Sequence, residues 1–137
     1  MKPKITTPDR GRLKALIESI GGEAGLQRIL EVFYRRMHAD PMLGYFFDGK
    51  DLPSISSKQA EFILMAAGLR SKFEGKGPAS AHTALPPIYS GHFDRRLVLL
   101  KEVLEAEGLP IESIETWVRF EESFRAAVVK TNPNPGS

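Results

Sequence analysis

The side chains that could do chemistry in this chain include three histidines, His38, His82 and His92, and no cysteine. Without cysteine, the chain cannot form a disulfide, a thiolate metal site or an iron–sulfur cluster. Zinc would need three or four ligands at compact spacing, and three separated histidines do not supply such a set. The chain also lacks a Gly-x-Ser-x-Gly motif and a phosphate-binding glycine loop, so neither a common nucleophile nor a nucleotide site is indicated.

His82 lies among helix-breaking residues, in the stretch FEGKGPASAHTALPP at 73–87. Pro78 suits the first turn of a helix and Pro86 would end it, so ASAHTAL predicts one or two helical turns. A helix this short does not stabilise itself, and something else must hold it. A single histidine is more commonly an exposed loop residue. The other interpretation is that His82 is the one protein ligand of a haem iron, whose porphyrin supplies four nitrogens.

Two polar side chains fall on otherwise apolar helix faces and are candidates for contact with a ligand. They are Tyr34 and, on the following helix, Gln59. Burying either without a hydrogen-bond partner costs about 1–3 kcal/mol. The simpler alternatives are a tyrosine whose hydroxyl reaches water and a glutamine at the edge of the apolar stripe. Shifting the register of the second helix by one residue would bring Ser56 and Ala60 inward instead.

The elements that must position these residues are predicted to be helices. Apolar residues recur at helical spacing over 10–20, 23–38, 54–69, 90–107 and 110–130. The stripe of the last stretch contains Ile114, Trp117, Val118, Glu121, Phe124 and Val128. No alternating strand pattern bounded by hairpin turns is present. We therefore predict an all-α fold of about five helices and one irregular connection.

Composition and charge exclude several classes of function. The chain has 137 residues, of which 42% are hydrophobic, which fits one domain with a substantial core. Its net charge is only +2, and the basic residues form no stripe with interleaved aromatics, so nucleic-acid binding is not indicated. No apolar run approaches the roughly 20 residues of a membrane span, and the first residues lack the apolar core of a secretory signal. We expect a cytoplasmic protein.

The order of these motifs resembles the truncated haemoglobins, the small two-over-two globins, from Gly21 to Val128. The motifs that carry the resemblance are IGGEAGLQRILEVFYRRMHADPMLGYFF, KQAEF, FEGKGP with the AH that follows it, and GHFDRRL. The KQAEF helix is most similar to the first subgroup, whereas the Leu-Pro-Pro after His82 is more similar to the third. The resemblance implies a globin-like domain, which we place at 10–131. The polar, proline-containing ends at 1–9 and 132–137 are expected to be flexible.

The resemblance also implies a non-covalently bound haem b and a role for each residue around it. His82 would bind the iron on the proximal side, while Tyr34 and Gln59 would face the bound ligand on the distal side. Lys58 would pair with a haem propionate. The other residues implied to line the haem are Phe46, Phe47, Ile55, Phe62, Ile63, Phe73 and Phe93.

The function implied is the binding of O2, NO and CO. Two uses of such a site stay open: a reversible oxygen carrier or sensor, and an enzyme that converts oxygen and nitric oxide to nitrate. The enzyme would need a separate reductase, because the sequence carries no flavin or nicotinamide domain. The alternative of a different class is a haem-free helical protein-interaction module. In that case Tyr34 and Gln59 would be surface or boundary groups.

Overall fold

The computed structural model describes residues 7–70 and 87–129, and within those ranges it contains helices and no strands. This confirms the predicted all-α class. The elements in chain order are α1 (Thr7–Ser19), α2 (Gly22–His38), the 3-10 helix η1 (Gly44–Phe47), α3 (Leu52–Ala66), α5 (Ser90–Ala106), α6 (Ile111–Glu122) and α7 (Arg125–Val128).

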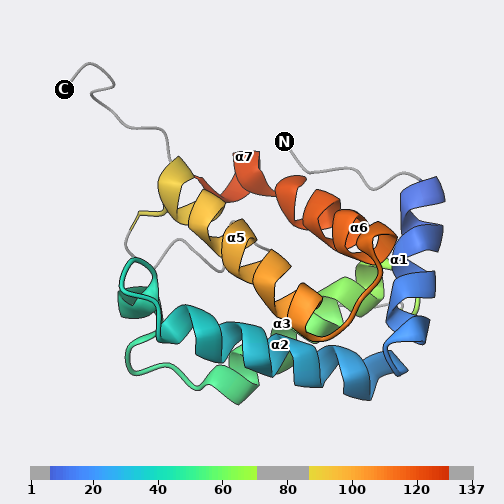
Figure 1. Cartoon of the computed structure of the whole chain (residues 1–137), viewed down its shortest axis with the longest axis horizontal. Helices are drawn as coiled ribbons and strands as arrows, with labels where there is room; N and C mark the ends of the chain where they lie inside the picture. The colour runs from blue at the N-terminus through green and yellow to red at the C-terminus, as the bar shows by residue number, and fades with distance from the viewer. Residues whose placement is uncertain (1–6, 71–86, 130–137) are drawn as a thin grey trace.

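The helices form two pairs, α2 with α3 and α5 with α6, and α2 also packs against α5 (Figure 1). Helix α1 closes one end of the molecule, where it contacts α6 and the start of α2. The core lies between the two pairs. Phe33 of α2, Leu100 of α5 and Trp117 of α6 are all buried there, each at 1% exposure or less. Burial of these apolar faces is the main force that holds the pairs together.

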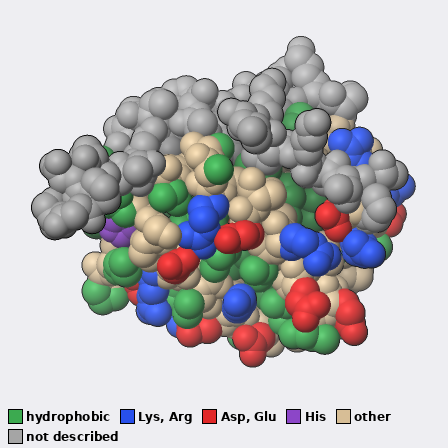
Figure 2. Space-filling view, turned by 90° about the horizontal axis from the view of Figure 1, so that it is seen from above, with side chains coloured by type: hydrophobic (Ala, Val, Ile, Leu, Met, Phe, Trp, Pro, Cys, Tyr) green, Lys and Arg blue, Asp and Glu red, His purple; other side chains and the backbone are tan. Residues whose placement is uncertain are grey.

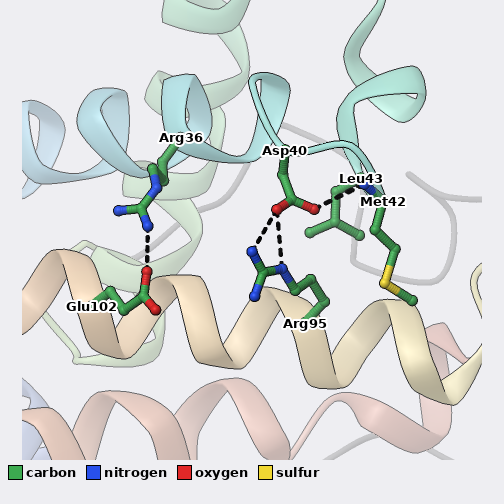
Figure 3. A network of polar contacts seen from close by, with 6 residues as sticks. All are labelled: Arg36, Asp40, Met42, Leu43, Arg95 and Glu102. Carbon is green, nitrogen blue, oxygen red and sulfur yellow. Dashed lines mark hydrogen bonds and ion pairs between the residues drawn. The ribbon is translucent and has the colours of Figure 1, made fainter.

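The corner after α2 is organised by one buried carboxylate, Asp40 (Figure 3). Its Oδ2 atom accepts hydrogen bonds from the backbone N–H groups of Met42 and Leu43, at 3.0 and 3.2 Å. Its Oδ1 atom accepts from Nε and Nη2 of Arg95 on α5, at 3.0 and 2.7 Å. The same side chain therefore shapes the turn and ties it to α5, which fixes where η1 and its phenylalanines lie.

Acidic, basic and hydrophobic side chains are interspersed over the surface shown in Figure 2. Several of the charges form exposed ion pairs between helices, such as Arg36 of α2 with Glu102 of α5 (Figure 3). Pairs this exposed contribute only about 0–1 kcal/mol each. Among the described helices, none has the length and apolar character needed to cross a bilayer.

Two helix boundaries differ from the sequence prediction. Helix α1 begins at Thr7, three residues before the expected start. The helix predicted over 110–130 is broken, because α6 ends at Glu122 and α7 begins only at Arg125. At the break, the Ser123 hydroxyl donates to the Phe120 carbonyl at 2.6 Å, and local bonds of this kind compete with helical ones.

Candidate functional site

The candidate site is built around Tyr34, whose ring is only 5% exposed. The apolar stripe of α2 directs this side chain inward, which is one of the two arrangements that the sequence left open for it. Phe47 of η1 lies against it in an edge-on arrangement, with ring centroids 5.7 Å apart. Phe33, the preceding residue of α2, lies 5.6 Å away on a tilted plane. The structure thus brings together Tyr34 and Phe47, two of the residues that the resemblance implies to lie around the haem.

An ion pair that the sequence analysis missed lies beside Tyr34. Arg96 of α5 and Glu121 of α6 are both largely buried, with side chains 18% and 6% exposed. Nε of Arg96 donates to Oε2 of Glu121 at 3.1 Å, and Nη2 lies at 3.1 Å from the same oxygen. The guanidinium carbon stands 5.0 Å from the centre of the Phe33 ring and 5.8 Å from that of Tyr34.

The electrostatics of this cluster keep the tyrosine neutral and the arginine charged. Burial raises the pKa of Tyr34, and the Arg96 charge opposes that rise while the Glu121 charge adds to it. The phenol therefore remains a hydrogen-bond donor at neutral pH. Burial alone would lower the pKa of Arg96. The Glu121 carboxylate stabilises the cation, so that pKa lies above its ordinary value. A neutral donor and a fixed cation thus lie side by side.

Several apolar side chains that pack against the core remain only half-buried. They come from η1, α3, α5 and the turn after α6, and they are Phe47, Ile55, Phe62, Leu97 and Phe124. Phe62 lies edge-on to Phe124 with ring centroids 5.3 Å apart. An apolar ligand that covered such surfaces would gain about 25 cal/mol for each square ångström removed from water.

The helix register of α3 brings Ser56 and Ala60 inward, at 0% and 2% exposure. This is the arrangement that a one-residue shift of the predicted register would give. Ser56 is satisfied there because its hydroxyl donates to the Leu52 carbonyl at 2.9 Å. Gln59 and Ile55 are half-buried at the edge of the inward face.

The remaining predicted residues fall into three groups. Phe46, Ile63 and Phe93 are buried, and Phe46 stacks on Tyr45 rather than on Tyr34, with centroids 4.2 Å apart. Lys58 is exposed on α3. Phe73 and His82 lie outside the described residues, together with the short helix predicted around His82.

Within residues 7–70 and 87–129, no three acidic or histidine side chains come close enough together to hold a metal ion. Two buried polar atoms of α6 have no hydrogen-bond partner, Nε1 of Trp117 and Oε1 of Glu121. Orphaned buried atoms are uncommon and call for a reason, such as a bound water or a ligand. Both belong to the helix that faces Arg96 and Tyr34.

Comparison with known proteins identifies relatives over most of the chain. The family described as "Bacterial-like globin" matches residues 15–130. A group 1 truncated haemoglobin of Mycolicibacterium paratuberculosis is 31% identical over 100 residues, which cover 73% of each chain. A group 1 truncated haemoglobin of Tetrahymena pyriformis is 26% identical over 96 residues, covering 70% of this chain and 78% of that protein.

Solved structures show the same fold. The Fe(III) form of truncated haemoglobin from Tetrahymena pyriformis superposes with a TM-score of 0.75 at 24% identity, covering 85% of this chain and 98% of that one. The 2/2 haemoglobin of Synechococcus sp. PCC 7002, in the cyanomet state with covalently attached haem, superposes with a TM-score of 0.72 at 24% identity. It covers 82% of this chain and 97% of that one.

Proposed function

We propose, because the chain belongs to the bacterial-like globin family, that it binds haem b non-covalently and uses it to bind a small diatomic gas. The observation that carries the proposal is the buried phenol of Tyr34 packed against Phe47. A buried hydrogen-bond donor with a cation beside it suits a ligand whose outer atom carries partial negative charge. Half-buried apolar side chains at the edge of the core, Phe47 beside Tyr34 among them, suit the flat hydrophobic macrocycle.

When bound, haem supplies an iron with a free coordination position for the gas. In this proposal, His82 would be the protein ligand of the iron. Tyr34 donates its hydroxyl hydrogen to the bound gas, and Gln59 at the edge of α3 offers a second donor. Lys58, exposed on the same helix, reaches a haem propionate. The chain has no cysteine, so a thioether link to the macrocycle is excluded.

A haem titration tests the proposal directly. The haem-free protein should take up one equivalent of added haem and acquire the intense absorption of a coordinated porphyrin. CO added to the reduced protein should then shift that absorption. If the protein stays colourless with excess haem, it is a haem-free helical protein and the proposal is wrong.

A second experiment tests whether the protein carries or senses oxygen or converts nitric oxide to nitrate. Conversion of O2 and NO to nitrate takes one electron from the haem iron, so repeated turnover needs an external reductant or a separate reductase. Stopped-flow mixing of the oxygenated protein with NO measures this reaction. Rapid NO consumption with one nitrate formed per haem would support nitric oxide detoxification. Slow consumption with reversible oxygen release would support oxygen carriage or sensing.

A further inference from the structure

The proposed gas binding assigns a role to Tyr34 but none to the neighbouring Arg96–Glu121 ion pair. Burying two charges is expensive, and a pair of well-packed apolar side chains in their place is often equally stable or more so. The pair also joins helices that already pack through an extensive apolar core. Stability alone therefore gives a weak reason for an arginine at this position.

The geometry leaves Arg96 with capacity to bind a further partner. Its Nε and Nη2 atoms face the Oε2 atom of Glu121. Its Nη1 atom lies 3.8 Å from the Met37 sulfur, and a thioether is a weak acceptor. The guanidinium also hydrogen-bonds to the Tyr34 hydroxyl. Because a guanidinium carries five N–H donors, these contacts leave it with donors for a further partner beside Tyr34.

Glu121 holds the cation in place and is itself incompletely satisfied. One of its oxygens accepts from Arg96, while the other, Oε1, is buried without a partner. The contacts from Nε and Nη2 to Oε2 hold the guanidinium in position, and the Glu121 carboxylate stabilises the Arg96 cation. Met37 and the rings of Phe33 and Tyr34 bound the guanidinium on the α2 side.

We propose that Arg96 determines ligand specificity by giving the site beside Tyr34 a fixed positive charge, so that small anions bind better than neutral gases of similar size. The ligand class is a small monovalent anion, such as azide or nitrite. The inference rests on the proposed haem binding, since the anion would occupy the free position on the ferric iron. Tyr34 and Arg96 would then be two donors to one ligand, and hydrogen bonds from a charged donor are about twice as strong as neutral ones.

The first experiment compares azide binding to the ferric protein with CO binding to the ferrous protein. In Arg96→Met, which keeps length and removes charge, azide affinity should fall about tenfold or more, the equivalent of one charge-assisted hydrogen bond. CO affinity should change less than about threefold, because CO has no charge for the cation to meet. Equal changes for the two ligands, or no change for azide, would overturn the proposal.

Three further variants separate charge from structure. Arg96→Lys retains the charge and should recover most of the azide affinity. Glu121→Gln removes the counter-charge and should leave azide affinity equal or higher, so a loss as large as that of Arg96→Met would point to a structural role only. The double variant Arg96→Met with Glu121→Gln leaves no unpaired charge and should fold. It should show the same azide loss, and wild-type azide affinity in it would contradict the proposal.

Arg36→Met is the matched control on the surface. It removes an exposed arginine whose ion pair joins α2 and α5, the helices that carry Tyr34 and Arg96. Neither azide nor CO affinity should change by more than about twofold, because an exposed charge is screened by water and salt. If this control weakens azide binding as much as Arg96→Met does, the effect comes from net charge rather than from the held cation.

A measurement on the haem-free protein keeps this inference distinguishable from the proposed function. Among the described residues, the charged groups that act on the Tyr34 phenol are Arg96 from α5 and Glu121 from α6. Because the Arg96 charge opposes the effect of burial, Arg96→Met should raise the Tyr34 pKa further. Phenolate absorption measures it, and Tyr34→Phe identifies the contribution of this residue. An unchanged Tyr34 titration would show that Arg96 does not act on the site, whether or not haem binds.

Discussion

At the scale of single residues, the site depends on how burial sets the protonation of Tyr34. Burial raises the pKa of this phenol, so the group keeps its proton through neutral pH and remains a donor. Its ring is held by Phe33 and Phe47, which limits the directions in which the hydroxyl can point. A donor fixed in this way loses little conformational entropy when it meets a ligand.

Replacing Tyr34 by phenylalanine should therefore speed oxygen dissociation from the ferrous haem protein. The lost hydrogen bond is worth about 0.5–3 kcal/mol, which corresponds to a rate increase of between about twofold and 150-fold. Rapid mixing of the oxygenated protein with an oxygen scavenger measures the rate. Tyr45→Phe, which alters a tyrosine that is 49% exposed, is the matched control and should leave the rate unchanged. An unaltered rate in Tyr34→Phe would show that its hydroxyl does not contact the ligand.

Replacing His82 by alanine should abolish or greatly weaken haem retention, because the proposed bond between its imidazole and the iron would be lost. Haem transfer to a competing apoprotein, followed by absorption, measures the loss. His38→Ala removes an exposed histidine at the end of α2 and should retain haem as the wild type does. If His82→Ala kept the wild-type iron spectrum, another side chain would have to be the ligand.

Residue types on the helix stripes reveal some of the site but not all of it. Tyr34 was detectable because a hydroxyl on an apolar stripe needs a partner, and the structure does bury it. Glu121 gave the same signal, since a carboxylate stood on the apolar stripe of residues 110–130. Arg96 gave none, because an arginine next to Arg95 in an amphipathic helix looks like part of a solvated face. Only the packing of α5 against α2 and α6 shows that Arg96 faces inward and Arg95 faces the corner.

At the scale of elements, the junction of α1 and α2 depends on a glycine that allows two backbones to approach. A Cβ atom added to Gly25 would lie 1.8 Å from the carbonyl oxygen of Ile20, which is a severe clash with backbone. Gly25→Ala should lower the free energy of unfolding by about 1–3 kcal/mol or more, the usual cost of overpacking. Urea denaturation monitored by circular dichroism measures this.

Gly11→Ala, on the neighbouring helix α1, should stabilise the protein instead. A Cβ at Gly11, within α1, meets nothing within 4 Å, so the change should stabilise the protein by about 0.5–1 kcal/mol through helix propensity. The two glycine-to-alanine changes should therefore alter the free energy of unfolding in opposite directions. If both stabilised the protein, the ends of α1 and α2 would not approach as closely as the structure shows.

The corner between α2 and η1 should make stability depend on acid pH through Asp40. The hydrogen bonds from Arg95 hold the pKa of Asp40 below its usual value of 3.8, although burial works against them. The charged carboxylate therefore stabilises the fold above about pH 4, and this contribution is lost as pH falls through the lowered pKa. Asp40→Asn should lose about 1–3 kcal/mol at pH 7, and the deficit should shrink below about pH 4.

Denaturant unfolding of both proteins between pH 2.5 and pH 7, a range that spans the usual pKa of an aspartate, tests this dependence. Asp48→Asn, an exposed aspartate at the end of the same corner, should change the unfolding free energy by less than about 0.5 kcal/mol throughout. A deficit in Asp40→Asn that stayed constant down to pH 2.5 would show that the carboxylate charge contributes nothing.

Helix existence was easier to predict than helix continuity. The stripes of residues 23–38 and 90–107 correspond closely to α2 and α5, because long periodic segments with clear end signals leave few alternatives. The break between α6 and α7 was not predictable, since neither Ser123 nor Phe124 is a strong helix breaker. The bend depends on a local serine hydrogen bond and on the packing of Phe124 against Phe62 and Phe120.

At the scale of the whole molecule, the two helix pairs enclose a core that is complete at α2, α5 and α6 but leaves apolar side chains half-buried at its edge. A domain of this size has only about 5–15 kcal/mol of net stability, so apolar surface left in water is a substantial loss. The proposed haem would cover part of this surface and would bind the folded state alone. Its affinity therefore adds directly to the stability of the fold.

Haem should accordingly raise the melting temperature in a concentration-dependent way. At a free haem concentration 100 times the dissociation constant, the stabilisation is about 2.7 kcal/mol, which corresponds to roughly 5–15 °C for a chain of this length. Calorimetry of the haem-free and haem-loaded protein measures the shift. His82→Ala should start from the haem-free melting temperature of the wild type and gain little from added haem, because apolar contact without the iron bond holds the macrocycle weakly. Equal shifts in the two proteins would mean that burial of the macrocycle, rather than the iron–histidine bond, couples the cofactor to the fold.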